Sequence, residues 1–377
     1  MRTHFDPSGT SDALRQGLDA LTAADSTKGI LILGCDANAW RAEEIETIVG
    51  RCELPVFGGL FPQIIHRNQN HALGTLLLGL ECEPEIAVVN GLSDAAADFE
   101  QQVEAVTGHW SDADGETTML VFVDGLSTQI SALLRGLFMN FGLANNFIGG
   151  GAGSLSFEQT PCIIGPSGLI ADSAILARLP VPSRVGVTHG WRPISDPIKV
   201  TSSCGNLIKT LGWEPAFDVY KRIVEAYSGQ RLEIDNFFAL AKSHPFGITK
   251  IGTEIVVRDP VMVVDGTDLV CVGEVPEGGF VRLLEGTPQT LLAAAREARE
   301  LAVSDAPADE GATPLFIDCI SRVLFLGDRI LDELQVVGAD KPVDGAFTLG
   351  EIANTGDAFL ELYNKTSVFS MLCDRAD

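Results

Sequence analysis

The sequence predicts an α/β fold, and three observations lead to that class. Segments with apolar residues three and four positions apart, typical of amphipathic helices, alternate with short apolar runs of strand length. Most of these runs lack polar alternation, as expected for strands covered on both faces. The same order of runs recurs along the chain, which indicates a duplicated unit. We therefore expect two lobes, the N-terminal one built from a repeated strand–helix–strand–strand unit.

Four segments carry the helical spacing. Ser127 is placed to cap one of them, and Pro215 and Pro288 stand in first turns, where a helix tolerates proline. The expected helices are residues 93–106, 127–142, 214–227 and 287–303.

The strand-like runs fall into two matched series. Gly58-Gly59 of the first series aligns with Gly149-Gly150 of the second, and Asn90 aligns with His189. The first series consists of runs at 30–37, 55–61, 75–80 and 86–92. The second consists of runs at 119–126, 146–153, 173–179 and 184–191. A third, weaker copy is expected at 314–321, 345–352 and 358–369.

The C-terminal lobe is expected to begin after Ser228-Gly229-Gln230, which divides the chain into domains at 28–228 and 229–370. Alternating short strands and Gly/Asp turns over 254–284 predict an antiparallel meander, followed by a further α/β segment. Residues 304–313, rich in Pro, Asp and Gly, predict an exposed loop.

Composition excludes several classes of function. A formal net charge of −25 repels phosphate backbones and anionic membranes. The apolar runs are shorter than the roughly 18 residues that a membrane-spanning helix needs, and the first residues do not resemble a secretory signal. The eight cysteines contain no Cys-x-x-Cys pair, which argues against a zinc ribbon or thioredoxin-type centre. We therefore expect a cytoplasmic protein with reduced cysteines.

Two groups of segments resemble the FIST family. FIGGGAGS (147–154) and the stretch 186–220, with its His-Gly-Trp segment, are similar to the N-terminal FIST domain. Three later stretches, including FIDCISRVLFLG and FTLGEIANTGDAFLELYNKTSVF, are similar to the C-terminal FIST domain. The resemblance implies an intracellular sensor of small molecules, with amino acids as one proposed ligand class. It also implies a separate partner, such as a histidine kinase, a cyclic-di-nucleotide enzyme or a chemotaxis receptor.

Some members of the family are haem proteins that sense nitric oxide, so histidines at strand ends are candidate haem ligands. His189, next to Trp191, is the first candidate, and a neutral imidazole there suits an axial haem ligand or a hydrogen bond to a ligand. His244 is the second candidate for a cofactor. Both residues also admit a structural interpretation, in which the imidazole bonds to nearby backbone.

Five residues from three C-terminal segments are expected to bind the ligand together with His189 and Trp191. Arginine forks onto carboxylates and glutamate holds ammonium groups, so an Arg–Glu pair suits the two ends of an amino acid. The alternative is that this pair forms a salt bridge with itself. The five residues are Cys319, Arg322, Glu351, Asn364 and Thr366.

A cysteine-dependent hydrolase is the alternative from a different class of function. A cation such as Arg322, three residues after Cys319, lowers the pKa of a nearby thiol and favours a cysteine-dependent hydrolase. No histidine follows Cys319 in the sequence to act as its base. The glycine run at 149–153 lacks the third glycine of the dinucleotide pattern, so a structural turn is favoured over phosphate binding. We therefore expect a binding protein and not an enzyme.

Overall fold

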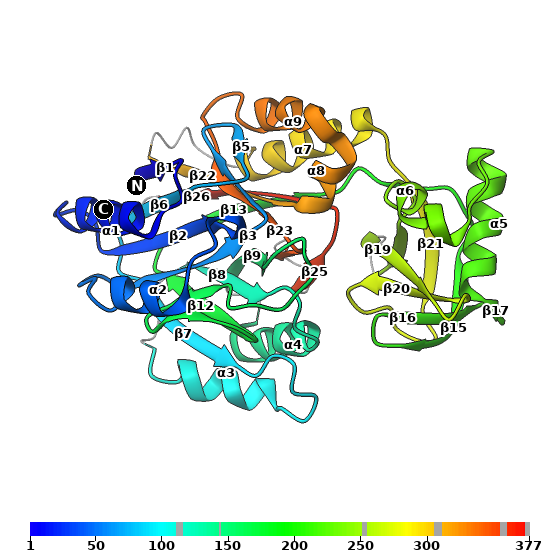
Figure 1. Ribbon diagram of the computed structural model, residues 1–377, viewed down its shortest axis with the longest axis horizontal. Coiled ribbons are helices and arrows are strands. Elements are labelled where there is room, and N and C mark those ends of the chain that lie inside the picture. Colours follow the sequence, from blue (N-terminus) through cyan, green and yellow to red (C-terminus); the bar gives the residue numbers. More distant parts are fainter. Residues whose placement is uncertain (111–115, 143–144, 251–254, 305–310, 355–359, 374–377) are drawn as a thin grey trace.

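The computed structural model describes residues 1–110, 116–142, 145–250, 255–304, 311–354 and 360–373. It confirms the α/β class, with three six-stranded mixed sheets and a fourth sheet that closes into a six-stranded antiparallel barrel. Figure 1 shows the three sheets forming a large body, with the barrel lobe to one side of it. Within the described ranges, no helix has the length and hydropathy to cross a membrane.

The body consists of three copies of one unit, in the order strand, helix, strand, helix, strand, hairpin, strand. The first unit contains β1 (Arg2–Asp6), α1 (Ser11–Thr22), β2 (Gly29–Cys35), α2 (Ala42–Val49), β3 (Val56–Phe61), β4 (Gln63–His66), β5 (Gln69–His71) and β6 (Thr75–Leu80). The second contains β7 (Glu85–Asn90), α3 (Phe99–Thr107), β8 (Thr117–Asp124), α4 (Ile130–Phe141), β9 (Asn145–Ala152), β10 (Ile163–Gly165), β11 (Gly168–Ile170) and β12 (Ser173–Leu179).

The third unit is split in the sequence, and its second helical segment is divided in two. It contains β13 (Ser183–Thr188), α7 (Pro288–Val303), β22 (Thr313–Cys319), α8 (Ile320–Leu326), α9 (Ile330–Val337), β23 (Asp344–Thr348), β24 (Glu351–Ala353), β25 (Glu361–Tyr363) and β26 (Ser367–Leu372). The third copy expected from the sequence is thus present. Part of its expected run at 358–369, residues 358 and 359, lies outside the described residues.

The hairpins link the three units into one body. In each unit the second strand pairs in parallel with the third and antiparallel with the last. The hairpin that follows the third strand then leaves its own sheet. Hairpin β4–β5 pairs with β23, β10–β11 with β3, and β24–β25 with β9. Each sheet is therefore completed by a hairpin from a neighbouring unit. No local sequence pattern predicts this pairing.

Three glycines occupy the same place in the three units. Gly58, Gly149 and Gly345 each lie against the strand that runs parallel to them, opposite Ile32, Val121 and Phe316. A Cβ atom on these glycines would lie 1.8, 1.7 and 1.8 Å from the carbonyl oxygens of those residues. Only glycine permits this approach. The match fixes which positions are equivalent throughout the units.

The unbroken apolar runs follow from burial on both faces. In β8, Leu120 and Phe122 pack into a core shared by the three sheets. The alternate residues Val121 and Val123 pack against the helices α3 and α4. Because side chains alternate between faces, a strand with apolar partners on both sides shows no polar alternation.

The barrel lobe is an insertion in the third unit, between β13 and α7. Ser228–Gln230, the expected boundary, lies at the end of α5 and inside this inserted segment. Antiparallel strands are present in the expected segment 254–284 from residue 255 on, residue 254 lying outside the described residues, but β21 pairs with β15 and β18 instead of continuing a meander from β20. The lobe contains β14 (Arg192–Pro193), β15 (Ile198–Cys204), β16 (Leu207–Leu211), β17 (Glu214–Pro215), α5 (Ala216–Ser228), α6 (Phe237–Ala241), β18 (Phe246–Thr249), β19 (Ile255–Val264), β20 (Asp268–Val272) and β21 (Phe280–Glu285).

The four expected helices appear as α3, α4, α5 and α7. Helix α3 starts later than expected, because the Asp98 side chain accepts a hydrogen bond from the backbone N–H of Gln101 and caps it there. The repeat is also offset: the runs expected to close the first and second units are β7 and β13, which open the second and third. Most of the expected loop at 304–313 lies outside the described residues.

Candidate functional site

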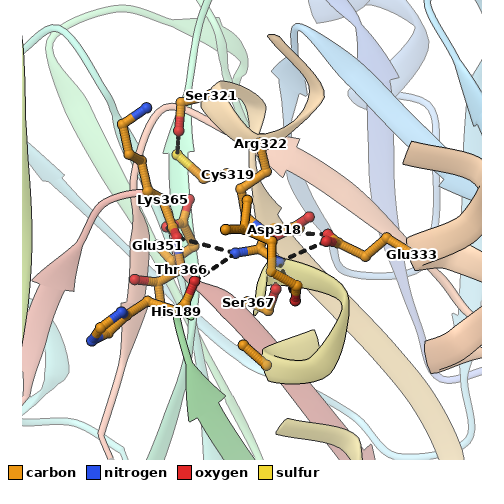
Figure 2. A network of polar contacts seen from close by, with 12 residues as sticks. His189, Asp318, Cys319, Ser321, Arg322, Glu333, Glu351, Lys365, Thr366 and Ser367 are labelled. Atoms are coloured by element: carbon orange, nitrogen blue, oxygen red, sulfur yellow. Dashed lines mark hydrogen bonds and ion pairs between the residues drawn. The ribbon is translucent and has the colours of Figure 1, made fainter. Parts of the chain in front are cut away.

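A buried polar cluster lies where three strands of the third unit end or begin. Cys319 ends β22, Glu351 begins β24, and Asn364, Lys365 and Thr366 connect β25 to β26. Figure 2 shows Cys319, Glu351 and Thr366 close together, beside the network around the Arg322 guanidinium. The structure thus brings together the C-terminal segments that the sequence analysis grouped.

Glu351 is fully buried and hydrogen-bonded at both carboxyl oxygens. The hydroxyl of Thr348 donates to Oε1 at 3.0 Å, and the backbone N–H of Thr366 donates to Oε2 at 3.2 Å. Burial raises the pKa of this carboxyl to about 8, against hydrogen bonds from Cys319, Thr348 and Thr366 that lower it. Glu351 is therefore mainly uncharged at neutral pH.

The thiol of Cys319 is 4% exposed and accepts a hydrogen bond from the Ser321 hydroxyl at 3.0 Å. Burial, with a smaller contribution from the nearby Glu351, raises the pKa of this thiol. A nucleophilic cysteine needs the opposite shift. The effect of burial is larger than that of the neighbouring Arg322, whose guanidinium is bonded to Glu333 and to backbone carbonyl groups.

Asn364 carries the unpaired groups of the cluster. Its side chain is 1% exposed, and neither the amide nitrogen nor the amide oxygen has a hydrogen-bond partner in the described part of the chain. Gly350 lies next to it: a Cβ atom there would be 3.2 Å from Nδ2 of Asn364. Buried amides are normally hydrogen-bonded, so an unpaired one indicates a missing ligand or water molecule.

Arg322 was expected to grip a ligand carboxylate, and its contacts do not support that role. Nε and one terminal nitrogen bond to both carboxylate oxygens of Glu333, at 3.2 and 2.6 Å, and Nε also lies 3.2 Å from Asp318. The remaining N–H groups donate to the carbonyl oxygens of His189, Lys365 and Leu291. All five donors are used inside the protein. The alternative of an Arg322–Glu351 salt bridge is likewise not formed.

Lys365 connects the cluster to the barrel lobe. Its ammonium is 1% exposed, lies 2.9 Å from the Asp259 carboxylate on β19 and donates to the Lys242 carbonyl oxygen at 3.0 Å. It also lies 5.1 Å from the ring centre of Trp191, whose indole N–H donates to the Lys365 carbonyl oxygen at 3.1 Å. Trp191, an expected ligand-binding residue, thus packs beside the cluster and holds its loop.

His189 is held in a tautomer that does not fit an axial haem ligand. The backbone N–H of Trp191 donates to its Nδ1 at 2.9 Å, so Nδ1 accepts and the single proton of the neutral ring lies on Nε2. Burial and the positive charge of Arg322 lower its pKa to about 4, which keeps the ring neutral. Figure 2 shows this ring directed away from Arg322. Iron would have to displace the Nε2 proton.

His244, the second expected haem ligand, is 8% exposed inside the barrel lobe. Its Nδ1 lies 2.9 Å from the Leu240 carbonyl oxygen and 3.1 Å from the Ser243 hydroxyl. These contacts match the structural interpretation, in which the ring bonds to nearby backbone. Within the described residues there is also no group of three or more His, Cys, Asp or Glu side chains arranged to hold a metal ion. The tautomer of His189 thus argues against haem at the first candidate, whereas in His244 the Nδ1–H donates to the Leu240 carbonyl oxygen and Nε2 is the acceptor.

One position of the repeated unit carries an ionisable residue in the third copy and an apolar residue in the other two. Glu351 pairs with Gly150, and the matching positions in the other two sheets are Ile163 and Ile64. Both isoleucines are 0% exposed. The fold therefore accepts an apolar side chain at this place twice and carries an ionisable one only in the third unit. Thr366 corresponds in the same way to Ser173.

The sequence analysis did not identify the acidic partners of Arg322 and Lys365. Glu333 lies on α9, eleven residues after Arg322, and Asp259 lies in the inserted lobe. Spacing alone does not single out Glu333, because the glycine after α8 breaks the helical period. Lys365 had a usable signal: it stands between Asn364 and Thr366, both expected at the site.

Comparisons with known proteins identify the family. The FIST N domain matches residues 29–214 and the FIST C domain matches residues 216–354. No curated protein sequence matches the chain. Among solved structures, a chorismatase crystal structure aligns over 99% of this chain and 98% of that one, at 10% identity and a TM-score of 0.35, which is too low to support an inference. The two domain matches span most of the sequence, and the chain belongs to the FIST family, which is linked to signal transduction.

Proposed function

We propose that this protein is a cytoplasmic sensor that binds a small molecule at the polar cluster of Cys319, Glu351, Asn364 and Thr366 and signals to a separate protein. One observation carries the proposal. At a place where the same fold twice buries isoleucine, the third unit buries a carboxyl group and, beside it, an amide without a partner.

The energetics favour a functional reason for this difference. Burying a polar group without a hydrogen bond costs on the order of 1–3 kcal/mol in proteins. The unpaired amide of Asn364 and the raised pKa of Glu351 both represent such costs. Residues that lower stability in this way are commonly kept for binding or catalysis. The raised pKa of the Cys319 thiol makes binding the better-supported of the two.

A route for the signal lies in the loop that carries the site. Lys365 stands between two site residues, and its ammonium contacts Asp259 in the barrel lobe. A second link joins Arg258 of the lobe to the carbonyl oxygen of Leu362 and the carboxylate of Glu361, at 2.9 and 3.1 Å. A ligand that changes the loop therefore changes the contacts that hold the lobe, and a partner that binds one arrangement better responds to it.

The partner follows from the family and not from a surface of this chain. A histidine kinase, a cyclic-di-nucleotide enzyme or a chemotaxis receptor acting in trans is the expected class. The ligand-binding part of the proposal is independent of which of these is correct.

Thermal unfolding with a panel of small metabolites tests the binding step. A ligand at 100 times its dissociation constant adds about 2.7 kcal/mol of stability. Thr366→Ala and Asn364→Leu should abolish the shift of the active compound. Ser173→Ala removes the hydroxyl at the equivalent place in the second unit and should leave the shift unchanged. A shift that survives both site variants would place the ligand elsewhere and refute the proposal.

A Lys365→Met variant tests the signal route. The ligand should still bind, because Lys365 faces the barrel lobe, but limited proteolysis at the two chain crossings between body and lobe should no longer respond to ligand. A proteolysis response equal to that of the unaltered protein would show that ligand binding affects the barrel lobe through contacts other than Lys365.

A further inference from the structure

The ligand proposed for this site was expected from the family resemblance to be an amino acid, whose two charges need charged partners. The cations beside the site are already paired. Arg322 donates all five N–H groups to the protein, and Lys365 is paired with Asp259 and lies over the ring of Trp191. Arg322 therefore has no N–H left for a ligand carboxylate, and the ammonium of Lys365 is directed to Asp259 and the Lys242 carbonyl oxygen in the barrel lobe.

The buried carboxyl groups beside the site also offer no free charge to a ligand. Glu351 is mainly protonated at neutral pH, since burial raises its pKa to about 8. Burial and the nearby Glu333 also raise the pKa of Asp318, and its Oδ1 lies 3.2 Å from Nε of Arg322. Among the described residues, then, no charge at the cluster is left without an internal partner. An ion transferred from water into such a site loses several kcal/mol of hydration without compensation.

The two unpaired polar atoms of Asn364 belong to one neutral group and lie side by side. The amide of Asn364 offers N–H donors and a carbonyl acceptor, both buried and without a partner in the described chain. A planar group that presents one acceptor next to one donor complements it with two parallel hydrogen bonds. Amides, lactams and ureas present this pair and carry no charge at neutral pH. A carboxylic acid has the same geometry but is ionised there.

Gly350 lies against this amide and carries no side chain there. It adopts a φ of +92°, in the region that favours glycine, and any Cβ would lie 3.2 Å from Nδ2 of Asn364. In the second unit the equivalent residue is Cys162, whose side chain is buried there. The third unit thus lacks a side chain next to this amide, where the second unit has one.

From these observations, and resting on the sensor function proposed above, we propose that the site recognises an uncharged ligand with an adjacent hydrogen-bond donor and acceptor, such as an amide, lactam or urea, through the side chain of Asn364.

Isothermal titration calorimetry of the full chain at pH 7 tests this inference with four probes. The lactam 2-pyrrolidone and the cyclic urea hydantoin are neutral and match the amide. Proline and glycine are of similar size and zwitterionic. We expect at least one neutral probe to bind at least tenfold more tightly than both zwitterions. Asn364→Ala should weaken that binding tenfold or more, as the loss of about 1.4 kcal/mol predicts.

Two further variants keep the result interpretable. Asn364→Leu is similar in size, has neither donor nor acceptor on its side chain and should also lose binding, which covers the case in which Asn364→Ala does not fold. Ser173→Ala, at the equivalent of Thr366 in the second unit, should bind as the unaltered protein does. Tighter binding of proline or glycine, dependent on Asn364, would overturn the neutral class and leave the sensor function standing. If none of these probes, nor any compound of the metabolite panel, binds in a manner that depends on Asn364, both proposals fail.

Discussion

Replacing Glu351 by glutamine should make the protein slightly less stable at acidic pH and more stable at alkaline pH. In the folded protein this carboxyl has a pKa of about 8, whereas its ordinary value is 4.5. Below pH 4.5 both states hold the proton, so the group has no effect. Between pH 4.5 and 8 only the folded state holds it, so stability falls as the pH rises. Above pH 8 the penalty is constant.

The magnitude follows from about 1.4 kcal/mol for each pH unit. At pH 7 the carboxyl costs about 3 kcal/mol, and at pH 8 and above between about 4 and 5 kcal/mol. Glutamine removes this cost, but it has one acceptor oxygen where Glu351 accepts from both Thr348 and Thr366. One of those bonds is lost, at about 1 kcal/mol. The variant should therefore be slightly less stable than the unaltered protein at pH 4.5 and about 3 kcal/mol more stable at pH 8.

Urea unfolding at pH 5, 6, 7 and 8 measures this difference. Tryptophan fluorescence is a suitable signal, because Trp191 is 3% exposed and lies beside the cluster. Glu43→Gln, on an exposed face of α2, is the matched control substitution. A Glu351→Gln variant that is less stable at pH 8, or whose difference from the unaltered protein does not change between pH 5 and 8, would refute the assignment of a buried, protonated carboxyl.

Three further predictions concern single residues. Arg322→Met should destabilise the protein by about 3–5 kcal/mol in urea unfolding, because it leaves Glu333 buried without its cation; a loss below 1 kcal/mol would contradict the network. The imidazole of His189 should not titrate between pH 5.5 and 8 in NMR spectra, since its pKa is lowered to about 4, and reconstitution with haem should give no Soret band that depends on this residue. Gly149→Ala should prevent folding or lower the melting temperature severely, because its Cβ would lie 1.7 Å from the Val121 carbonyl oxygen; circular dichroism of a stable, folded variant would contradict that geometry.

The sequence by itself determined the secondary elements and the presence of repeats. Periodicity, caps and first-turn prolines are local properties, and they located α4, α5 and α7 within a few residues. The glycines at Gly58 and Gly149 marked the first two units correctly, because each unit needs the same close strand contact. The segments that carry Cys319, Glu351 and Asn364 were also grouped in advance, through the family resemblance.

Only the tertiary structure decided how these parts combine and what each polar residue does. The hairpins cross into neighbouring sheets, and about a hundred residues of barrel lobe separate β13 from the rest of its unit. Such pairings depend on contacts between distant residues, which no local pattern encodes. The same holds for the site: Arg322 is neutralised by Glu333, and Glu351 is protonated because the fold buries it. Charge and residue type indicated a site for a charged ligand, whereas burial and pairing leave an amide without a partner.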